Sequence, residues 1–589
     1  MIVKMRKVTV LASKTSVDST LHDLRELGLV HIRHLRKPHA DYIDTVKKRV
    51  SRIDKILNII EDSKKQKELS KEELVAAPKE IISLFREKNK LKESIEELKS
   101  ETDWFKQWGD ISKKDINNLA DKGIFINLYI CKKKEFEKAK KNHLIYKIGK
   151  IGPNCQVIDI SRGKDKDLGF EKIEAPEKDL SSLRKKINSL EQEKKELENK
   201  IKLFSIYRNC FIKYRDKLLN KFEFIKVKFG MAESESLAWL QGFCPVDSVP
   251  VIEKTAKNKG WGIVVEKPDN SEKVPTLIRN PRWVKIIKPV FNFMGTLPGY
   301  REYDISFWFL LFFSLFFAML VGDAGYGVIF LMAAYLARRK FKKAPAEPFF
   351  LIYTLSLATI IWGALSGNWF GSEAIARLPF FNSLVIDRIN SFTKVNQDFM
   401  IYFCFIIGVV HLSIAHLIKA FRYLNSLKAL AEIGWTCILW TAFFVASKLL
   451  VGRPAPDFII PLGVIGIAAV ILFSNFQKNI FKGALSTLGT LPLDVISSFT
   501  DIISYLRLFA VGYATIAVAA AFNTMATTTG LGGILGGAVA AVILFLGHSL
   551  NILLCLMSVI VHGIRLNLLE FSGQLGMEWS GQEYKPFRE

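Results

Sequence analysis

The C-terminal part of the chain contains a nearly uncharged stretch that is long enough to form two membrane-spanning helices. Residues 505–572 carry two arginines, one glutamate and two histidines, and nearly all their other residues are aliphatic, aromatic, Gly, Ser or Thr. A guanidinium in the middle of an apolar helix costs at least about 2.5 kcal/mol. Arg507 and Arg565 are therefore the first candidates for a functional site.

Composition divides the chain into two halves. The net charge is +25 and 49% of the residues are hydrophobic, but residues 1–300 are rich in Lys, Glu and Asp, whereas residues from about 303 onward are mostly Phe, Leu, Ile, Ala and Gly. This pattern predicts a soluble half followed by a membrane half. The first residues, MIVKMRKVTVLAS, do not resemble a signal peptide, so we expect the soluble half to stay in the cytoplasm.

The sequence offers no sign of an independent catalytic or nucleic-acid-binding activity. No Walker loop, no GxGxxG after a predicted strand and no catalytic triad is present, and no cofactor is expected. The seven cysteines form no CxxC pair and no metal-ligand spacing with His, which favours reduced buried thiols. The Lys and Arg residues alternate with Glu along helices or lie in loops beside apolar segments, so they do not indicate nucleic-acid binding.

Two heptad patterns run through the soluble half. Apolar residues recur at alternating spacings of three and four from Ile43 to Ile60, and this seam resumes after Pro78 from Leu84 to Leu98. A second seam runs from Leu183 to Phe204, with Lys194 interrupting one slot. Strand-like runs lie between the two seams, in a stretch of about 104–176. This order predicts an antiparallel coiled coil (about 43–103 and 177–221) that carries a distal lobe. Use of the coil for dimerisation alone is the alternative.

The residues that flank the coiled coil have an α/β pattern. Strands are predicted at 6–13 and 29–35 around a helix at 16–28, and a strand, helix and strand follow between about 237 and 267. Residues 1–42 and 222–270 are therefore expected to form one proximal lobe. The soluble half, 1–300, is predicted to be a cytoplasmic dumb-bell, in which the coiled coil bears two small α/β lobes.

Eight apolar segments are predicted to span the membrane within residues 301–589, and the two long ones at the C-terminal end should be tilted. They cover about 305–321, 324–337, 349–370, 399–418, 434–451, 458–474, 497–525 and 534–571. The first two are separated at 322–327 (GDAGYG), because the basic cluster at 338–343 (RRKFKK) belongs on the cytoplasmic side. Lys419, Arg422, Lys428, Lys478 and Lys482 then also lie inside, although the outer loop at 371–398 contains Arg377, Arg388 and Lys394. Both termini are expected in the cytoplasm.

Polar residues form a line along the last span, which is about 38 residues long, whereas about 20 cross a bilayer. They lie three or four residues apart, which aligns them on one face of an α-helix: His548, Asn551, Cys555, Ser558, His562 and Arg565. Such a line is what a hydrated half-channel needs, because its groups replace bulk water. Glu570 lies slightly off the line, as an interface carboxylate or as part of an inner access path.

The two arginines are predicted at similar depth. Arg507 is about ten residues into its span, so it lies about 15 Å deep, near the middle of the membrane. The carboxylates that this chain offers nearby, Glu570, Asp501 and Asp494, all lie towards the inner surface. A deep partner is therefore expected from another polypeptide.

Several motifs together resemble one known family. They are SYLRLFAVGYA (504–514), VHGIRLNLLEF (561–571), GDAGYG (322–327), GYREYD (299–304) and GQEYKPF (581–587). With this architecture they are similar to the stator ion-channel subunit of V-type and A-type rotary ATPases, called the a subunit, or subunit I in prokaryotes. The resemblance covers essentially the whole chain, and its two arginine motifs are the most specific.

The resemblance assigns roles to individual residues. Arg507 matches the family's essential arginine, which faces the ion-carrying carboxylate of each rotor-ring subunit, and Arg565 with His562 matches the supporting arginine motif that Glu570 closes. Cys555 stands where many eukaryotic members have an acidic residue. The half-channel to the far side is then expected to rely on other groups, with His548 and Asn551 as our candidates.

The resemblance also implies partners and a location. The chain is expected to be a non-catalytic, multi-pass protein of the inner cell membrane that contacts a proteolipid ring (c or K subunits), peripheral-stalk subunits E and G, and the C or d component of the central stalk. The ring ligands decide whether H⁺ or Na⁺ is carried. The alternatives are a stand-alone secondary transporter or channel with a regulatory coiled coil, which predicts an inverted repeat that the spans do not show, and a structural tether, which leaves the arginines unexplained.

Overall fold

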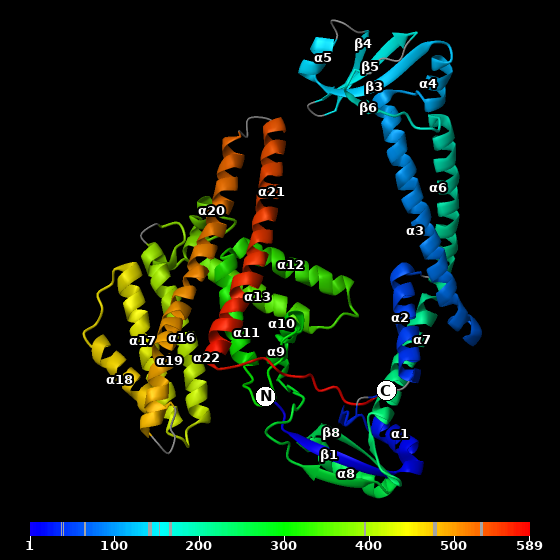
Figure 1. Ribbon diagram of the computed structural model, residues 1–589. Coiled ribbons are helices and arrows are strands. Elements are labelled where there is room, and N and C mark those ends of the chain that lie inside the picture. The colour runs from blue at the N-terminus through cyan, green and yellow to red at the C-terminus, as the bar shows by residue number, and fades with distance from the viewer. Residues whose placement is uncertain are drawn as a thin grey trace. The chain divides into compact units, whose positions relative to one another are not determined.

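The computed structural model of the protein is mainly helical (Figure 1). It describes residues 1–589 except 37, 39–40, 64–65, 140–143, 152–153, 164–167, 394–395, 475–479, 530–533 and 589. The chain divides into two compact units. Unit 1 contains Met1–Val10, Leu27–Ile32 and Gly242–Arg588, and unit 2 contains Leu11–Glu26 and Arg33–Gln241.

The first sheet contains strands from both ends of the N-terminal half of the chain. Its order is β2-β8-β1-β9, with β7 paired to β8. Burial alternates along the later part of β1, where Val8, Val10 and Ala12 point into the core, as the period of two in a strand requires. The short strand β7 (Ala232–Glu233) was not predicted, and the other elements lie where the sequence predicts them: β1 (Met5–Ser13), α1 (Val17–Leu27), β2 (His31–Arg33), β8 (Leu237–Pro245), α8 (Val249–Lys259) and β9 (Gly262–Glu266).

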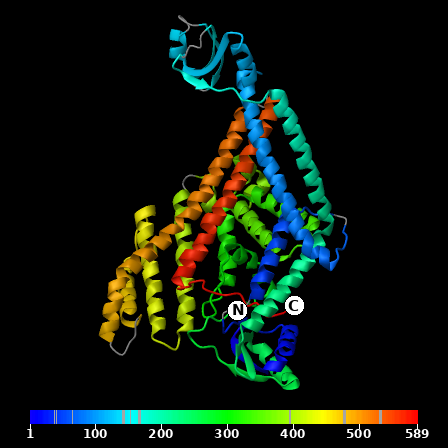
Figure 2. The same ribbon diagram turned by 45° about the vertical axis from the view of Figure 1, so that its right-hand side comes forward.

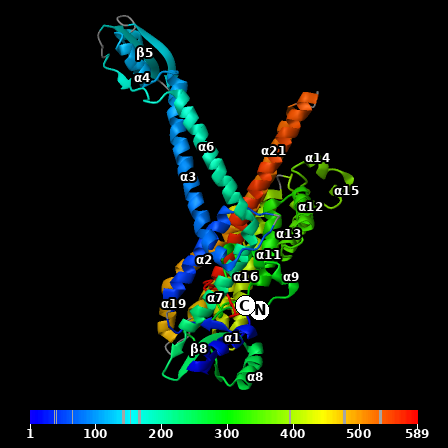
Figure 3. The same cartoon turned by 90° about the vertical axis from the view of Figure 1, so that its right-hand side faces the viewer.

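Unit 2 is built on two pairs of long helices. Helix α2 (Asp41–Ile59) packs on α7 (Arg208–Phe229), and α3 (Lys71–Trp108) packs on α6 (Leu180–Leu203), beside which it runs in Figure 3. Predicted heptad positions supply part of the contacts, with Ile53, Leu57 and Ile60 buried in one cluster and Ile95, Leu98, Leu183 and Ile187 buried in the other. Apolar seams thus fix which helix pairs with which.

Helix α3 begins before Pro78 rather than after it, which corrects the predicted interruption of the first seam. A capping box starts the helix, because the Ser70 hydroxyl accepts a hydrogen bond from the Glu73 amide (3.3 Å) and the Glu73 carboxylate accepts one from the Ser70 amide (2.9 Å). The interruption lies instead in the connection between α2 and α3.

A second sheet follows α3 and has the order β4-β5-β3-β6. Its strands confirm the three strand-like runs of the sequence and add a short fourth strand. Cys131 and Cys155 are direct partners in the register of β3 and β5, and both are free buried thiols. The elements are α4 (Lys113–Ala120), β3 (Ile124–Lys132), α5 (Lys133–Ala139), β4 (Ile145–Ile151), β5 (Asn154–Arg162) and β6 (Glu171–Ile173).

The apolar half forms helices in every predicted segment. In the described part of the chain, five helices are long and apolar enough to cross a membrane, or six if one bent pair counts as a span. The helices that precede the last two spans are α11 (Ser306–Val321), α12 (Ala324–Lys340), α13 (Glu347–Leu365), α16 (Gln397–Arg422), α17 (Lys428–Val451) and the shorter α18 (Ile459–Phe473). The count of eight spans stays a prediction.

The bent pair consists of α11 and α12, which meet at an angle of 120°. The predicted break at 322–327 is confirmed, and Gly322 makes it possible because its φ of 64° lies in the left-handed region. This turn ends α11, and α12 begins directly after Asp323.

The last two spans are much longer than a bilayer requires. Helix α19 (Ile480–Ser504) continues into α20 (Leu506–Thr528), and α21 (Ile534–Ser558) continues through π-helical turns into α22 (Ser572–Gln574). The apolar stretches measure 44 and 41 residues, so helices of this length must tilt or project beyond a bilayer. Helices α20 and α21 lie side by side (Figure 2).

The C-terminal tail runs across unit 1 and ends beside strand β2. Parallel bridges join Leu297 to Ser580 and Thr276 to Glu583. The amide of Phe587 donates to the Val30 carbonyl (2.8 Å), and the amide of Lys585 donates to Nδ1 of His31 (3.0 Å). These contacts give the GQEYKPF motif a structural role, because it fastens the end of the last span to the N-terminal strands.

This attachment is predicted to weaken in acid. Burial lowers the pKa of His31, so unfolded His31 binds more protons than folded His31 as the pH falls below about 6.5, and the attachment is strongest above that pH. Amide hydrogen exchange at 581–588, corrected for the intrinsic rate, should therefore be faster at pH 5.5 than at pH 7.5. His31→Asn, which keeps an acceptor but does not titrate, should remove the difference. The control His22→Asn should leave it, and an equal response in both variants would contradict the assignment.

Candidate functional site

Both candidate arginines reach the same carboxylate. Nη2 of Arg507 and Nε of Arg565 each lie 3.6 Å from Oε1 of Glu570. Nη2 of Arg507 also donates a hydrogen bond to Ser504 Oγ (3.0 Å). The Glu570 side chain is 4% exposed, whereas Arg507 is 25% exposed and Arg565 is 52% exposed. The cluster therefore has a buried anion and two cations that reach the surface.

This arrangement differs in part from the expectation that the arginines would find their partner on another polypeptide. Glu570 reaches both, but one carboxylate balances only one of two guanidiniums. Asp494 is exposed, and Asp501 accepts a hydrogen bond from Gln574 Nε2 (2.7 Å). Within the described residues, Nη1 of Arg507 and Oε2 of Glu570 are buried without a hydrogen-bond partner. The site keeps one positive charge in excess.

Two π-helical segments bring Glu570 into this cluster. They cover Val559–Gly563 and Leu566–Phe571, on either side of Arg565. A π turn holds more residues than an α turn, so it rotates all later side chains relative to a regular α-helix. Glu570, predicted off the polar line, is thereby buried against the arginines. π turns inside helices are frequent at functional sites.

The predicted polar line is only partly one continuous surface. Asn551 and Cys555 are buried, His548, Ser558 and His562 are half-buried, and Arg565 is half exposed. The line is thus buried at Asn551 and Cys555 and reaches the surface at Arg565.

At the His548 end of the line, a hydrogen-bond network surrounds Tyr326. Asn523 Nδ2 donates to the Phe370 carbonyl (2.7 Å), which leaves Asn523 Oδ1 to accept from Nε2 of His548 (3.1 Å). Nδ1 of His548 then accepts from the Tyr326 hydroxyl (2.7 Å), whose oxygen accepts from Asn551 Nδ2 (3.0 Å). In this arrangement Nε2 of His548 acts as a donor and Nδ1 as an acceptor.

Asp323 holds the break between α11 and α12 in place. Its buried carboxylate accepts hydrogen bonds from four amides, those of Gly325 (2.8 Å), Tyr326 (3.2 Å), Phe370 (3.0 Å) and Gly371 (3.1 Å). A Cβ at Gly325 would lie 2.5 Å from the Phe370 ring, so only glycine fits there. The GDAGYG motif therefore caps α12 and positions Tyr326 for the network. In the sequence, only the position of Asp323 directly before a predicted helix indicates this capping role.

A second polar cluster, which the sequence analysis missed, lies at the ends of four helices. Nδ1 of His416 bonds Glu432 (2.7 Å), and its Nε2 bonds Gln574 Oε1 (3.0 Å). The amide of Gln574 donates to Asp501, and Lys419 forms an ion pair with Glu432 (3.0 Å). These residues come from α16, α17, α19 and α22, so no spacing along the chain reveals them.

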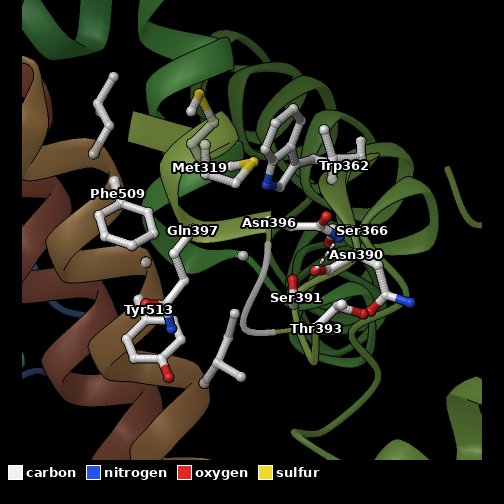
Figure 4. Close-up of a pocket in the computed structure, with 16 residues that line it drawn as sticks. Met319, Trp362, Ser366, Asn390, Ser391, Thr393, Asn396, Gln397, Phe509 and Tyr513 are labelled. Carbon is white, nitrogen blue, oxygen red and sulfur yellow. Dashed lines mark hydrogen bonds between the residues drawn. The ribbon is translucent and has the colours of Figure 1, made fainter. Parts of the chain in front are cut away.

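A pocket with about 520 Å³ of empty space lies beside α20. Its wall begins at Leu508, the residue that follows Arg507 in the sequence. In Figure 4, Phe509 and Tyr513 of α20 face Met319, Trp362 and a group of small polar side chains from the 390–397 region. None of the described lining residues is Asp, Glu, Lys, Arg or His. The cavity offers neutral hydrogen-bonding groups only. In the part of the chain that the structure describes, no cluster of His, Cys, Asp or Glu could hold a metal ion.

Comparison with known proteins connects this geometry to a family. No family model matches the chain. V-type ATP synthase subunit I of Borreliella burgdorferi is 32% identical to it over 619 aligned positions, which cover 100% of this chain and 99% of that protein. The chain belongs to the subunit I family of V-type and A-type ATP synthases. It is a non-catalytic membrane subunit of such a complex.

Further relatives and one solved structure are also similar to the chain. V-type ATP synthase subunit I 1 of Treponema pallidum is 28% identical, with 100% of both chains covered. A-type ATP synthase subunit I of Methanocaldococcus jannaschii is 24% identical, over 81% of this chain and 73% of that protein. A crystal structure of the cytoplasmic N-terminal domain of subunit I aligns with 44% of this chain and 99% of its own at 15% identity, with a TM-score of 0.24.

The Tyr326 network should contribute measurably to stability. Tyr326→Phe removes the hydroxyl that His548 and Asn551 share, and the loss of these two hydrogen bonds should lower the free energy of unfolding by about 2 kcal/mol. Tyr335→Phe removes an exposed hydroxyl from the same helix and serves as the control. Thermal unfolding in detergent measures both. Equal midpoints for the two variants would show that the network contributes no stability.

Proposed function

We propose that this protein provides the ion-translocating site of the complex, where Arg507 faces the carboxylate of each passing proteolipid-ring subunit. The excess positive charge of the cluster supports this proposal most directly, because two guanidiniums share one buried carboxylate. A carboxylate that arrives from a neighbouring polypeptide would balance the second guanidinium. The partial exposure of both arginines gives it access.

The charges suggest how transport is coupled to rotation. A ring carboxylate that faces lipid must be neutral, with H⁺ or Na⁺ bound, because an isolated charge is costly there. Beside Arg507 the ionised form is favoured, so the ion leaves into one half-channel. After the carboxylate has passed, it reloads from the other half-channel. Arg507 also repels a free cation, which prevents a direct leak.

The two polar networks are our candidates for the half-channels. His548 and Asn551 lie at the outer end of the line, and Cys555, Ser558 and His562 continue it towards Arg565. Hydrogen bonds hold the donors and acceptors of the outer group in fixed directions, which suits the relay of water or protons. At the other end, the Asp501–Gln574–His416 cluster has the ionisable groups that an inner path needs.

The soluble part would hold the protein still against torque. We propose that α2 with α7 and α3 with α6 form an antiparallel coiled coil between a proximal lobe (1–42 and 222–270) and a distal lobe (104–176), and that 301–589 crosses the inner membrane eight times with both termini in the cytoplasm. Peripheral-stalk subunits E and G and the C or d component of the central stalk would bind the lobes. A stand-alone transporter is disfavoured, because the chain belongs to a family of proteins that work within a complex.

Replacement of the central arginine tests the site. In reconstituted vesicles that contain the whole complex, Arg507→Ala should abolish ATP-driven H⁺ or Na⁺ uptake while the subunits still co-purify, because the passing carboxylate loses the charge that favours its ionised form. Arg453→Ala is a matched control, since that guanidinium lies 3.8 Å from the Tyr402 ring, outside the cluster. Normal uptake with Arg507→Ala would refute the proposal.

Stalk binding tests the role of the soluble part. The detergent-solubilised full chain should retain the peripheral-stalk heterodimer in a pull-down. A variant with 110–175 replaced by a short Gly/Ser linker should retain much less, because it lacks the distal sheet. A matched variant with the loop 380–390 altered should bind normally. Undiminished binding without the distal sheet would exclude this lobe as the attachment site.

A further inference from the structure

One face of α12 forms a hollow that no described part of the chain covers. The hollow contains about 1320 Å³ of open space, with Val328, Met332 and Tyr335 on its wall and Tyr353 of α13 at its side. Met332 is 60% exposed and Tyr335 is 56% exposed. These apolar residues share one helical face, because they are three or four residues apart.

The other end of the same hollow is strongly basic. Arg338, Arg339 and Lys342 line it, and no acidic residue of the described chain does. The Arg338 guanidinium lies 4.5 Å from the centre of the Phe350 ring, so α13 fixes its position. None of the three basic groups forms an ion pair with a described carboxylate of the chain. The charge at this end is therefore available to a ligand.

The apolar wall and the basic end follow one another along α12. Val328 and Arg339 are 11 positions apart in this helix, which corresponds to about 16 Å along its axis. An acyl chain can therefore lie along the apolar wall while the headgroup of the same lipid reaches the basic end.

We propose that this hollow binds an anionic phospholipid, with an acyl chain along Val328, Met332 and Tyr335 and the phosphate at Arg339 and Lys342. Basic pockets beside membrane helices are suited to anionic headgroups. A neutral lipid would leave three cations unbalanced, and free phosphate would not use the apolar wall. A protein partner would have to bring several carboxylates to the edge of the membrane.

The chain contains a matched control for the charge. Lys340 and Lys343 lie in the same basic cluster, but neither lines the hollow. The double variants Arg339→Gln/Lys342→Gln and Lys340→Gln/Lys343→Gln therefore remove the same net charge from the same segment. Native mass spectrometry of the delipidated full chain, titrated with phosphatidylglycerol or phosphatidylcholine, counts the bound lipids.

The wild type should bind phosphatidylglycerol at least about fivefold more tightly than phosphatidylcholine. Arg339→Gln/Lys342→Gln should remove this preference, whereas Lys340→Gln/Lys343→Gln should keep it. Met332→Lys, which places a charge on the apolar wall, should weaken binding of both lipids. Equal losses in the two double variants would indicate a general positive surface and overturn the proposal. A missing preference in the wild type, or displacement of the lipid by another polypeptide in the intact complex, would also overturn it.

Discussion

The sharing of one buried carboxylate by two guanidiniums is the interaction on which the membrane part depends. Glu570 compensates part of the charge of Arg507 and Arg565 within an otherwise apolar stretch, and to remove one member of such a buried ion pair is costly. The same arrangement is incomplete in charge. Under the proposed function this incompleteness is needed, because full neutralisation within the chain would leave no charge for a passing carboxylate to balance.

The surrounding structure positions this cluster through backbone irregularities. π-helical turns on both sides of Arg565 rotate Glu570 inward, and the turn at Gly322 and Asp323 brings Tyr326 against the last span. Regular helices alone would place neither group correctly. Irregular backbone is tolerated at membrane depth where protein buries it, and here side-chain hydrogen bonds such as those to Asp323 stabilise it.

Much of this fold follows from periodicity in the sequence. The heptad seams identified α2, α3 and α6, and the apolar segments identified the membrane helices, because both signals extend over many residues. The site was less predictable. A polar line drawn with 3.6 residues per turn places Glu570 off the face of Arg565, since the π turns leave no trace in residue spacing. His416, Glu432 and Gln574 meet only through tertiary packing, so their partners could not be inferred from one sequence.

The C-terminal tail has a mechanical consequence. Leu297 pairs with Ser580, and the amide of Phe587 bonds to Val30, so the polypeptide is closed into a ring between its first strands and its last helix. A force on the helix that bears Arg565 can then reach the N-terminal sheet by two routes. One runs through the other membrane helices, and the other runs through the short C-terminal segment. The C-terminal segment therefore transmits tension, and a protein fused to the C-terminus would pull on this segment directly.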